Sequence, residues 1–310
     1  MRSLAVINQK GGAGKTTTAV NVADALARAG ERVLLIDLDP QSHATLHLGV
    51  QLGAEELSVY DVMVRDVSAR EAWRCVAARL TLLPAGIDLV GAEIELRERP
   101  EREYALARAL ESCDGDFSYC IVDCPPSLGE LTINALAAVD ELIIPLQPHF
   151  LALQGMGRLL ETVTLVRGVL NPRLRVSGIA LCMFETGTRL AQEVLTDITE
   201  FIAAATPDDA WFGARVFDTK VRRNIKLAEC PSFGQTIHAY APGSHGAIDY
   251  QALTEEIVRA HSAAAVDRPD ATEPVSKPVA DVLPAGTAVP EPVGPNAALI
   301  VPQSADRPDP

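Results

Sequence analysis

Short apolar runs alternate with amphipathic segments over roughly the first 265 residues of the chain. The apolar runs have the length of buried parallel strands, and the segments between them have the three- to four-residue spacing of helices that pack on a sheet. The alternation predicts a doubly wound, mostly parallel α/β sheet flanked by helices. The predicted strands are 4–7, 32–37, 79–84, 117–123, 141–145, 175–183 and 211–218, and the predicted helices are 17–28, 91–99, 103–113, 128–138, 154–169, 190–204 and 248–264, with short helical pieces in 43–78.

A glycine-rich segment, Asn-Gln-Lys-Gly-Gly-Ala-Gly-Lys-Thr-Thr at residues 8–17, joins the first predicted strand to the first predicted helix. Glycines at this position let backbone N–H groups approach phosphate oxygens, and the helix dipole adds positive potential there. We expect Lys15 to reach the outer phosphates and the Thr16 hydroxyl to bind Mg²⁺. The segment therefore predicts a P-loop NTPase, with a nucleotide site formed by Gly11, Gly12, Ala13, Gly14, Lys15, Thr16 and Thr17. From the pattern alone, Lys10 at the head of the loop is a solvated charge.

Two further predicted strands end in carboxylates. The strand 32–37 runs into Asp37-Leu38-Asp39-Pro40-Gln41, and the strand 117–123 ends in Asp123 before Cys-Pro-Pro. Ligands bind at the carboxyl ends of parallel strands, beside the phosphate loop. Asp123 matches a Walker B carboxylate that holds Mg²⁺ through its water shell. Asp37 is open to three interpretations: a residue that supports the magnesium site, the residue that positions the attacking water, or a cap at the end of the strand.

The composition excludes some classes of partner. A net charge of −14 argues against a generally basic nucleic-acid binder, so binding to DNA requires a local patch. The six cysteines show no CxxC pair, which predicts buried thiols in a reducing compartment. The phosphate loop begins too close to Met1 for a signal peptide, and no apolar run has membrane-spanning length. We expect a soluble cytoplasmic protein.

One local patch is basic. Residues 211–230 carry five basic and two acidic side chains, an excess of three positive charges in an acidic chain. Such a patch, doubled by the symmetry of a dimer, would bind phosphates without reading sequence. The candidate DNA-binding residues are Arg215, Lys220, Arg222, Arg223 and Lys226. The alternative is a solvated loop that happens to be basic.

The composition changes after residue 265. Prolines become frequent and no aromatic residue follows Tyr250. Such a segment cannot bury enough apolar surface to offset the entropy of ordering it. We therefore expect a P-loop ATPase domain at residues 1–265 and a disordered Pro-rich tail at 266–310.

The motifs together resemble the ParA/Soj group of the ParA/MinD superfamily. The loop Lys-Gly-Gly-Ala-Gly-Lys-Thr-Thr is similar to its deviant Walker A motif, with Lys10 as the additional lysine. The segments 34–41 and 121–127 resemble the family's second and third motifs, and 216–219, 223–229 and 231–234 resemble its late segments. Two departures affect the DNA-facing region, because Val-Arg-Arg-Asn stands at 221–224 and Gly187 replaces an arginine. Arg189, two positions further on, is the candidate to compensate for the second departure.

The resemblance implies a mechanism. Lys10 would contact the nucleotide of a second subunit, so the protein would form an ATP-dependent homodimer. Lys10, Lys15 and Asp39 would be catalytic, with Asp39 orienting the attacking water, and Asn224 would contact the adenine. The cofactors would be ATP and Mg²⁺, and the metal residues Thr16, Asp123 and Asp37. The partners would be non-specific nucleoid DNA and a ParB-like or cargo-adaptor protein that stimulates hydrolysis.

Other functions are compatible with a phosphate loop. A MinD-like membrane-cycling ATPase that regulates cell division is the principal alternative, but it needs a C-terminal amphipathic helix that the Pro-rich tail does not supply. A nitrogenase-reductase-like enzyme would need cluster-binding cysteines, and Cys124 has no clearly matched second cysteine. A structural protein with an unused loop is the remaining alternative.

Overall fold

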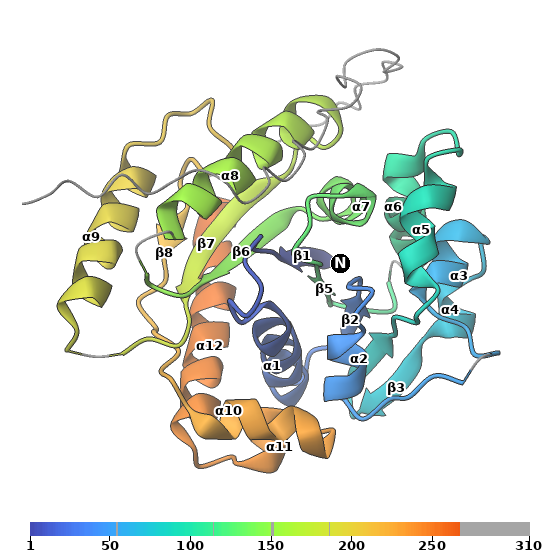
Figure 1. The fold of residues 1–310 in the computed structure, drawn as a ribbon, viewed down its shortest axis with the longest axis horizontal. Coiled ribbons are helices and arrows are strands. Elements are labelled where there is room, and N and C mark those ends of the chain that lie inside the picture. Colours follow the sequence, from blue (N-terminus) through green and yellow to red (C-terminus); the bar gives the residue numbers. More distant parts are fainter. Residues whose placement is uncertain (54, 114, 150–151, 186, 267–310) are drawn as a thin grey trace, which may run out of the picture. The chain divides into compact units, whose positions relative to one another are not determined.

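The computed structural model describes residues 1–266 except 54, 114, 150–151 and 186. Eight strands form one sheet in the order β3-β4-β2-β5-β1-β6-β7-β8 (Figure 1). All neighbouring pairs are parallel except β3 with β4. The strands are β1 (Arg2–Val6), β2 (Val33–Asp37), β3 (Arg74–Ala77), β4 (Leu80–Leu83), β5 (Tyr119–Asp123), β6 (Glu141–Leu146), β7 (Arg175–Leu181) and β8 (Arg215–Val216).

The helices connect successive strands and cover both faces of the sheet, as a doubly wound fold requires. Their bounds are α1 (Lys15–Arg28), α2 (His43–His47), α3 (Val59–Val64), α4 (Ala69–Ala72), α5 (Leu89–Leu96), α6 (Ala105–Glu111), α7 (Glu130–Ala138), α8 (Ala152–Val169), α9 (Arg189–Ala203), α10 (Ile225–Glu229), α11 (Ile237–Tyr240) and α12 (His245–Val266), with 3₁₀ turns at Arg102–Tyr104 and Cys230–Phe233.

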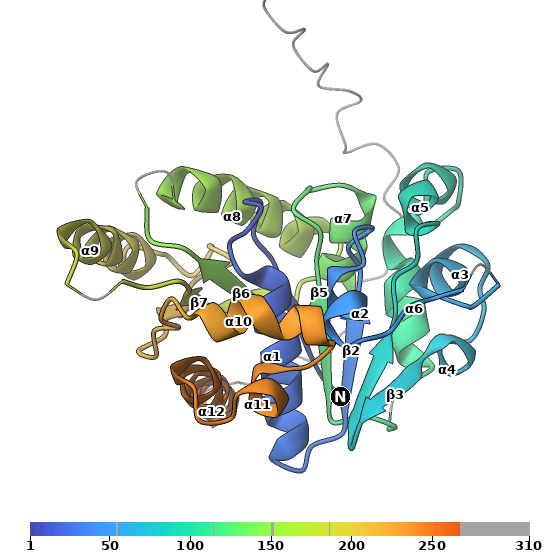
Figure 2. The same ribbon diagram turned by 60° about the horizontal axis from the view of Figure 1, so that its bottom comes forward.

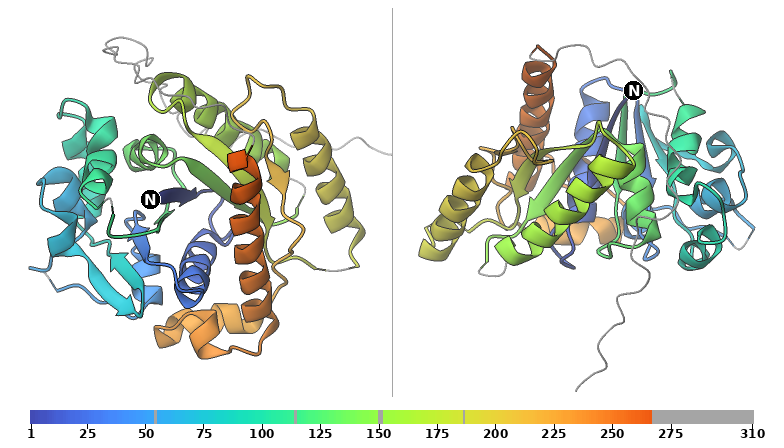
Figure 3. Two further views of the ribbon diagram at one scale, coloured as in Figure 1. Left: turned by 180° about the vertical axis from the view of Figure 1, so that it is seen from behind. Right: turned by 90° about the horizontal axis from the view of Figure 1, so that it is seen from above.

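The two faces of the sheet bury different sets of side chains, because successive strand residues point to opposite sides. In β2, Leu34 and Ile36 belong to the core beneath α7 and α8, whereas Val33 and Leu35 belong to the core beneath α1 and α12. Figure 3 shows α12 beside α1 on the second face. Burial on both faces explains why the central strands read as continuous apolar runs.

The structure corrects several predicted elements. Residues 43–78 contain β3 as well as helices, and this strand lacks an apolar run because it is half exposed at the edge of the sheet. The strand predicted at 211–218 shrinks to Arg215–Val216. Its close approach to β7 requires Gly178, because a Cβ there would lie 2.7 Å from the Phe217 ring. The predicted basic loop is helical from Ile225, where α10 begins.

The predicted disordered tail at 266–310 lies outside the described residues, apart from Val266 at the end of α12. The boundary between it and the ATPase domain therefore stays a prediction. Among the described residues, no helix is both long and apolar enough to cross a membrane.

Candidate nucleotide and magnesium site

The phosphate loop lies between β1 and α1, where its backbone can face a bound anion. Gly12 and Gly14 have φ values of +73° and +91°, a left-handed conformation that strains any residue with a Cβ. Gly14 is the N-cap of α1, and the Thr18 N–H donates to its carbonyl. The loops after β1, β2 and β5 lie at the same end of the sheet (Figure 2). The glycine pattern thus produces a turn that leads into a helix N-terminus.

Lys15 lies inside this turn. The residue is 7% exposed, and its Nζ donates to the carbonyl of Lys10 at 3.4 Å. Burial lowers the pKa of Lys15, and the nearby Asp123 and Asp39 carboxylates oppose that shift. Within the described part of the chain, the ammonium group makes one long hydrogen bond, to the loop itself, and a phosphate oxygen can replace that acceptor.

Asp37 and Asp123 end two neighbouring strands in register, since β2 pairs with β5 and these two residues are direct partners. Asp37 is fully buried. Its Oδ2 accepts hydrogen bonds of 2.7 Å from both the N–H and the hydroxyl of Thr45, and its Oδ1 accepts from the Asp39 N–H at 3.2 Å. Burial raises the pKa of Asp37 to about 6 despite these bonds. Asp37 therefore anchors the turn that carries Asp39, and most of its acceptor capacity is used.

Asp123 differs from Asp37 because neither of its carboxylate oxygens has a hydrogen-bond partner among the described residues, although it is fully buried. Burial and the neighbouring Asp37 raise its pKa well above the ordinary range. The Thr16 hydroxyl lies beside the carboxylate and moderates this shift without reaching hydrogen-bond geometry. An orphaned buried carboxylate next to a hydroxyl fits a hydrated Mg²⁺ ion, which takes oxygen ligands and keeps several waters.

Asp39 lies in the turn after β2 and is 6% exposed. Its Oδ1 accepts from the Gln41 N–H at 2.9 Å, and its backbone N–H is held by Asp37. The carboxylate acts on Lys15 and Asp123 through space, which places it near both. It has acceptor capacity left for a water molecule. Among the described residues, no group of three or more His, Cys, Asp or Glu side chains forms a metal cage.

Lys10 is exposed at the head of the loop. Its backbone N–H donates to Asn8 Oδ1, and its Nζ contacts Nε2 of His149, just beyond β6. Asn224, the predicted adenine contact, accepts the Lys226 N–H with its side-chain oxygen and so caps α10. Its amide group is then the part that can contact a ligand.

The five basic residues of the predicted DNA-binding patch fall into two groups. Arg222, Arg223 and Lys226 each form an ion pair, with Asp249, Glu185 and Glu229 respectively. Including Asp249 and Glu185, which the local sequence count omits, reduces the excess positive charge of the patch from three to one. Arg215 forms no ion pair with a described residue, and Lys220 donates to the carbonyls of Phe217 and Asp218.

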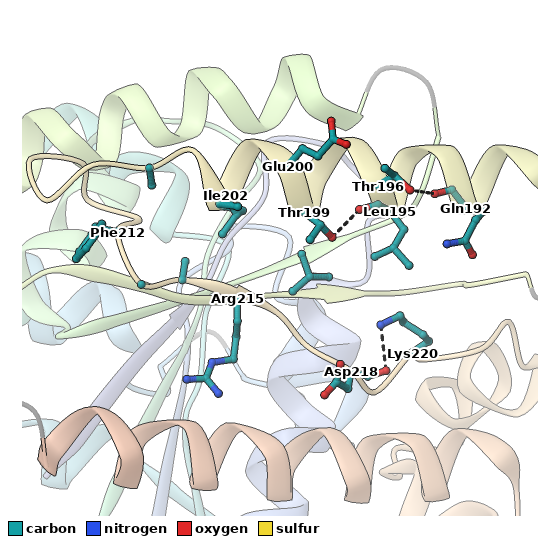
Figure 4. Close-up of a pocket in the computed structure, with 15 residues that line it drawn as sticks. Gln192, Leu195, Thr196, Thr199, Glu200, Ile202, Phe212, Arg215, Asp218 and Lys220 are labelled. Carbon is teal, nitrogen blue, oxygen red and sulfur yellow. Dashed lines mark hydrogen bonds between the residues drawn. The ribbon is translucent and has the colours of Figure 1, made fainter.

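Arg215 and Lys220 line a groove between α9 and β8, with a volume of about 890 Å³ (Figure 4). The floor is apolar and includes Leu195 and Ile202. Glu200 and Asp218 also line it, so its charge is balanced. None of the residues that line the groove belongs to the phosphate loop, and Arg215 and Lys220 are its two basic residues.

Sequence reasoning missed several residues that contact the predicted site residues directly in the folded chain but carry no motif in the sequence. Thr45 fixes Asp37, Asn8 and His149 hold the loop head, and Asp249 binds Arg222 through both Nε and the terminal amine. A threonine eight positions after a strand-end aspartate carries no motif of its own. These contacts depend on segments far apart in the sequence.

Comparisons with known proteins agree with this architecture. A family profile described as AAA domain matches residues 1–176. The sporulation initiation inhibitor protein Soj of Bacillus subtilis is 43% identical, over 82% of this chain and 97% of its own. The chromosome partitioning protein ParA of Caulobacter vibrioides is 40% identical, over 83% and 94%. A crystal structure of cobyrinic acid a,c-diamide synthase from Mycobacterium smegmatis, with ADP and magnesium bound, is 38% identical with a TM-score of 0.72, over 88% and 100%.

Proposed function

Because this chain belongs to the ParA/Soj family of P-loop ATPases, we propose that it binds Mg²⁺-ATP, dimerises, and hydrolyses the nucleotide to position a DNA or protein cargo. The dimer binds nucleoid DNA without sequence preference, and a ParB-like or adaptor protein stimulates hydrolysis. The relatives named as chromosome partitioning proteins or ATPases are 40% to 45% identical over most of this chain, and their names support the choice of function.

The single observation that supports nucleotide and magnesium binding most directly is the Asp123 carboxylate beside Thr16 and Lys15. Neither of its oxygens has a hydrogen-bond partner among the described residues. Burying an unpaired carboxylate is unfavourable, and a protein retains one where a ligand completes it. A crystal structure of a protein 38% identical to this chain contains ADP and magnesium. In this chain Thr16 and Asp123 would hold the metal. Asp37 would not bind it directly but would fix the turn that carries Asp39.

The chain's own residues supply positioning and charge. Lys15 exchanges the Lys10 carbonyl for phosphate oxygens, and the backbone N–H groups of 11–16 surround them. Asp39 accepts a hydrogen bond from the attacking water and orients it. Lys10 reaches the nucleotide of the second subunit and stabilises charge that develops during transfer. Turnover then depends on dimerisation.

DNA binding is assigned to Arg215 and Lys220 first, because no carboxylate of the described chain pairs with either of them. Arg222, Arg223 and Lys226 contribute less, since each would have to leave an acidic partner. Phosphate contacts of this kind are independent of sequence and weaken as salt increases.

The test is co-sedimentation with non-specific duplex DNA, with and without Mg²⁺-ATP, at two salt concentrations. We expect wild-type protein to bind only with ATP, and Lys10→Ala to lose binding. Arg215→Ala should bind more weakly, with a salt slope smaller by about one unit per subunit and so by about two units for the dimer. Arg259→Ala is the matched control, because Arg259 is exposed and pairs with Glu255 on α12.

Asp39→Ala should bind ATP and DNA but turn over little, which separates catalysis from assembly. Turnover like that of the wild type would move the catalytic role away from Asp39. Wild-type protein that ignores DNA with ATP but binds anionic liposomes would replace the proposal with the MinD-like alternative.

A further inference from the structure

The head of the phosphate loop contacts the carboxyl end of β6 and the segment that follows this strand. The Asn8 side-chain amide donates to the Pro145 carbonyl at 2.7 Å, and its oxygen accepts the Lys10 N–H at 2.9 Å. The Lys10 ammonium contacts Nε2 of His149 in the segment after β6. The backbone and the side chain of Lys10 are therefore both fixed by residues of its own subunit.

The donor and the acceptor of the contact between Lys10 and His149 can be assigned from their chemistry. Lysine ammonium is a donor without acceptor capacity, so the imidazole must accept through an unprotonated Nε2. Partial burial and the Lys10 ammonium both lower the pKa of His149, a direction that favours the neutral ring. Among the described residues, Lys10 is the charged group that acts on this ring.

The contact conflicts with the role proposed for Lys10. A lysine that reaches the nucleotide of a second subunit must leave an acceptor in its own subunit, unless that acceptor moves with it. We propose that His149 is a positioning residue that holds Lys10 in the separate chain, and that ATP-dependent dimerisation has to break this hold. The inference rests on the proposed function, because it assumes that Lys10 acts across a dimer.

The size of the effect follows from exposure. Lys10 is exposed and His149 is partly exposed, so the free energy of the contact between them is no larger than that of a surface interaction. The contact favours the separate chain by about threefold per subunit. Two subunits are released for each dimer, so removing His149 should tighten dimerisation by about tenfold.

The first arm of the experiment uses the ATP-free chain and NMR titration of the His149 ring. We expect the pKa of His149 to be higher in Lys10→Ala than in wild type, because the repulsive ammonium is gone. Equal pKa values in the two proteins would overturn the contact. This arm does not depend on dimerisation.

The second arm measures the dimer dissociation constant with ATP by sedimentation, in the slow-hydrolysing Asp39→Ala background. We expect His149→Ala to dimerise about tenfold more tightly, and His149→Gln to match the background protein, because an amide oxygen also accepts from lysine. His245→Ala, an exposed histidine at the start of α12, is the matched control.

If His149→Ala dimerises as tightly as the Asp39→Ala background protein, or less tightly, the proposal that His149 holds Lys10 in the separate chain is refuted. If the background protein and wild type both fail to dimerise with ATP, the proposed function and the dimerisation half of this inference are lost together. The NMR arm then still decides whether His149 contacts Lys10.

Discussion

The buried carboxylate of Glu141, at the amino-terminal end of β6, gives a stability prediction whose size comes from the structure. The side chain is 1% exposed and accepts from both Nε and a terminal amine of Arg2, at 3.1 and 2.9 Å. A terminal amine of Arg175 also donates to it at 2.9 Å, and His261 Nδ1 lies 2.6 Å away. The guanidinium groups of Arg2 and Arg175 hold the pKa of Glu141 at about 2, below its ordinary value of 4.5, although burial acts in the opposite direction.

The shift converts to stability by linkage. A depressed pKa in the folded state stabilises the fold above the unfolded pKa, and this contribution is lost as the pH falls from 4.5 towards about 2. A shift of about 2.5 units corresponds to about 3 kcal/mol at neutral pH. Glu141→Gln should therefore lower the free energy of unfolding by about 3 kcal/mol at pH 7.

The assay is urea denaturation of both proteins at pH 7 and pH 3.5. At pH 3.5 the wild type has lost about 1.4 kcal/mol of this contribution, so the gap between the two proteins should narrow by that amount. Glu193→Gln is the control, since Glu193 forms an exposed pair with Arg189 and should change stability by about 0.5 kcal/mol or less. A Glu141→Gln protein as stable as wild type at pH 7, or a gap that does not narrow, would refute the reasoning.

Three further predictions concern the site. Asp123→Asn should abolish Mg²⁺-dependent ATP binding while leaving the unfolding midpoint equal or higher, because it removes a carboxyl group whose charged form burial disfavours and which has no hydrogen-bond partner among the described residues; a lower midpoint in thermal denaturation would contradict this. Thr45→Val should reduce ATP turnover and cost about 2 kcal/mol of stability, because it removes a hydroxyl that donates to Asp37 and accepts from the Ala85 N–H; unchanged kinetics would separate Asp37 from the site. Gly14→Ala should weaken nucleotide binding, measured with a fluorescent ATP analogue, because its φ is +91° and a Cβ would lie 3.4 Å from Cys182; wild-type affinity would show that the turn can change shape.

The late basic segment shows where local reasoning fails. Counting charges along 211–230 treats the five basic residues as equivalent, because it sees no carboxylate outside that window. Asp249 on α12 and Glu185 after β7 come close to Arg222 and Arg223 only when the chain is folded. The same limit applies to β3, whose half-exposed pattern has no apolar run to mark it.

The sequence by itself determined the class of fold, the phosphate loop and the carboxylates at the ends of β2 and β5, because these depend on local apolar periodicity and on glycines that only one kind of turn requires. It also singled out Lys10 as unusual. The tertiary structure alone decided that Thr45 donates to Asp37, that the Asp123 carboxylate has no hydrogen-bond partner among the residues described, and that Lys10 lies against His149. These contacts depend on which segments, distant in the sequence, meet at the carboxyl ends of the strands. The charge and the hydrogen bonds of a site follow from that proximity and not from residue type alone.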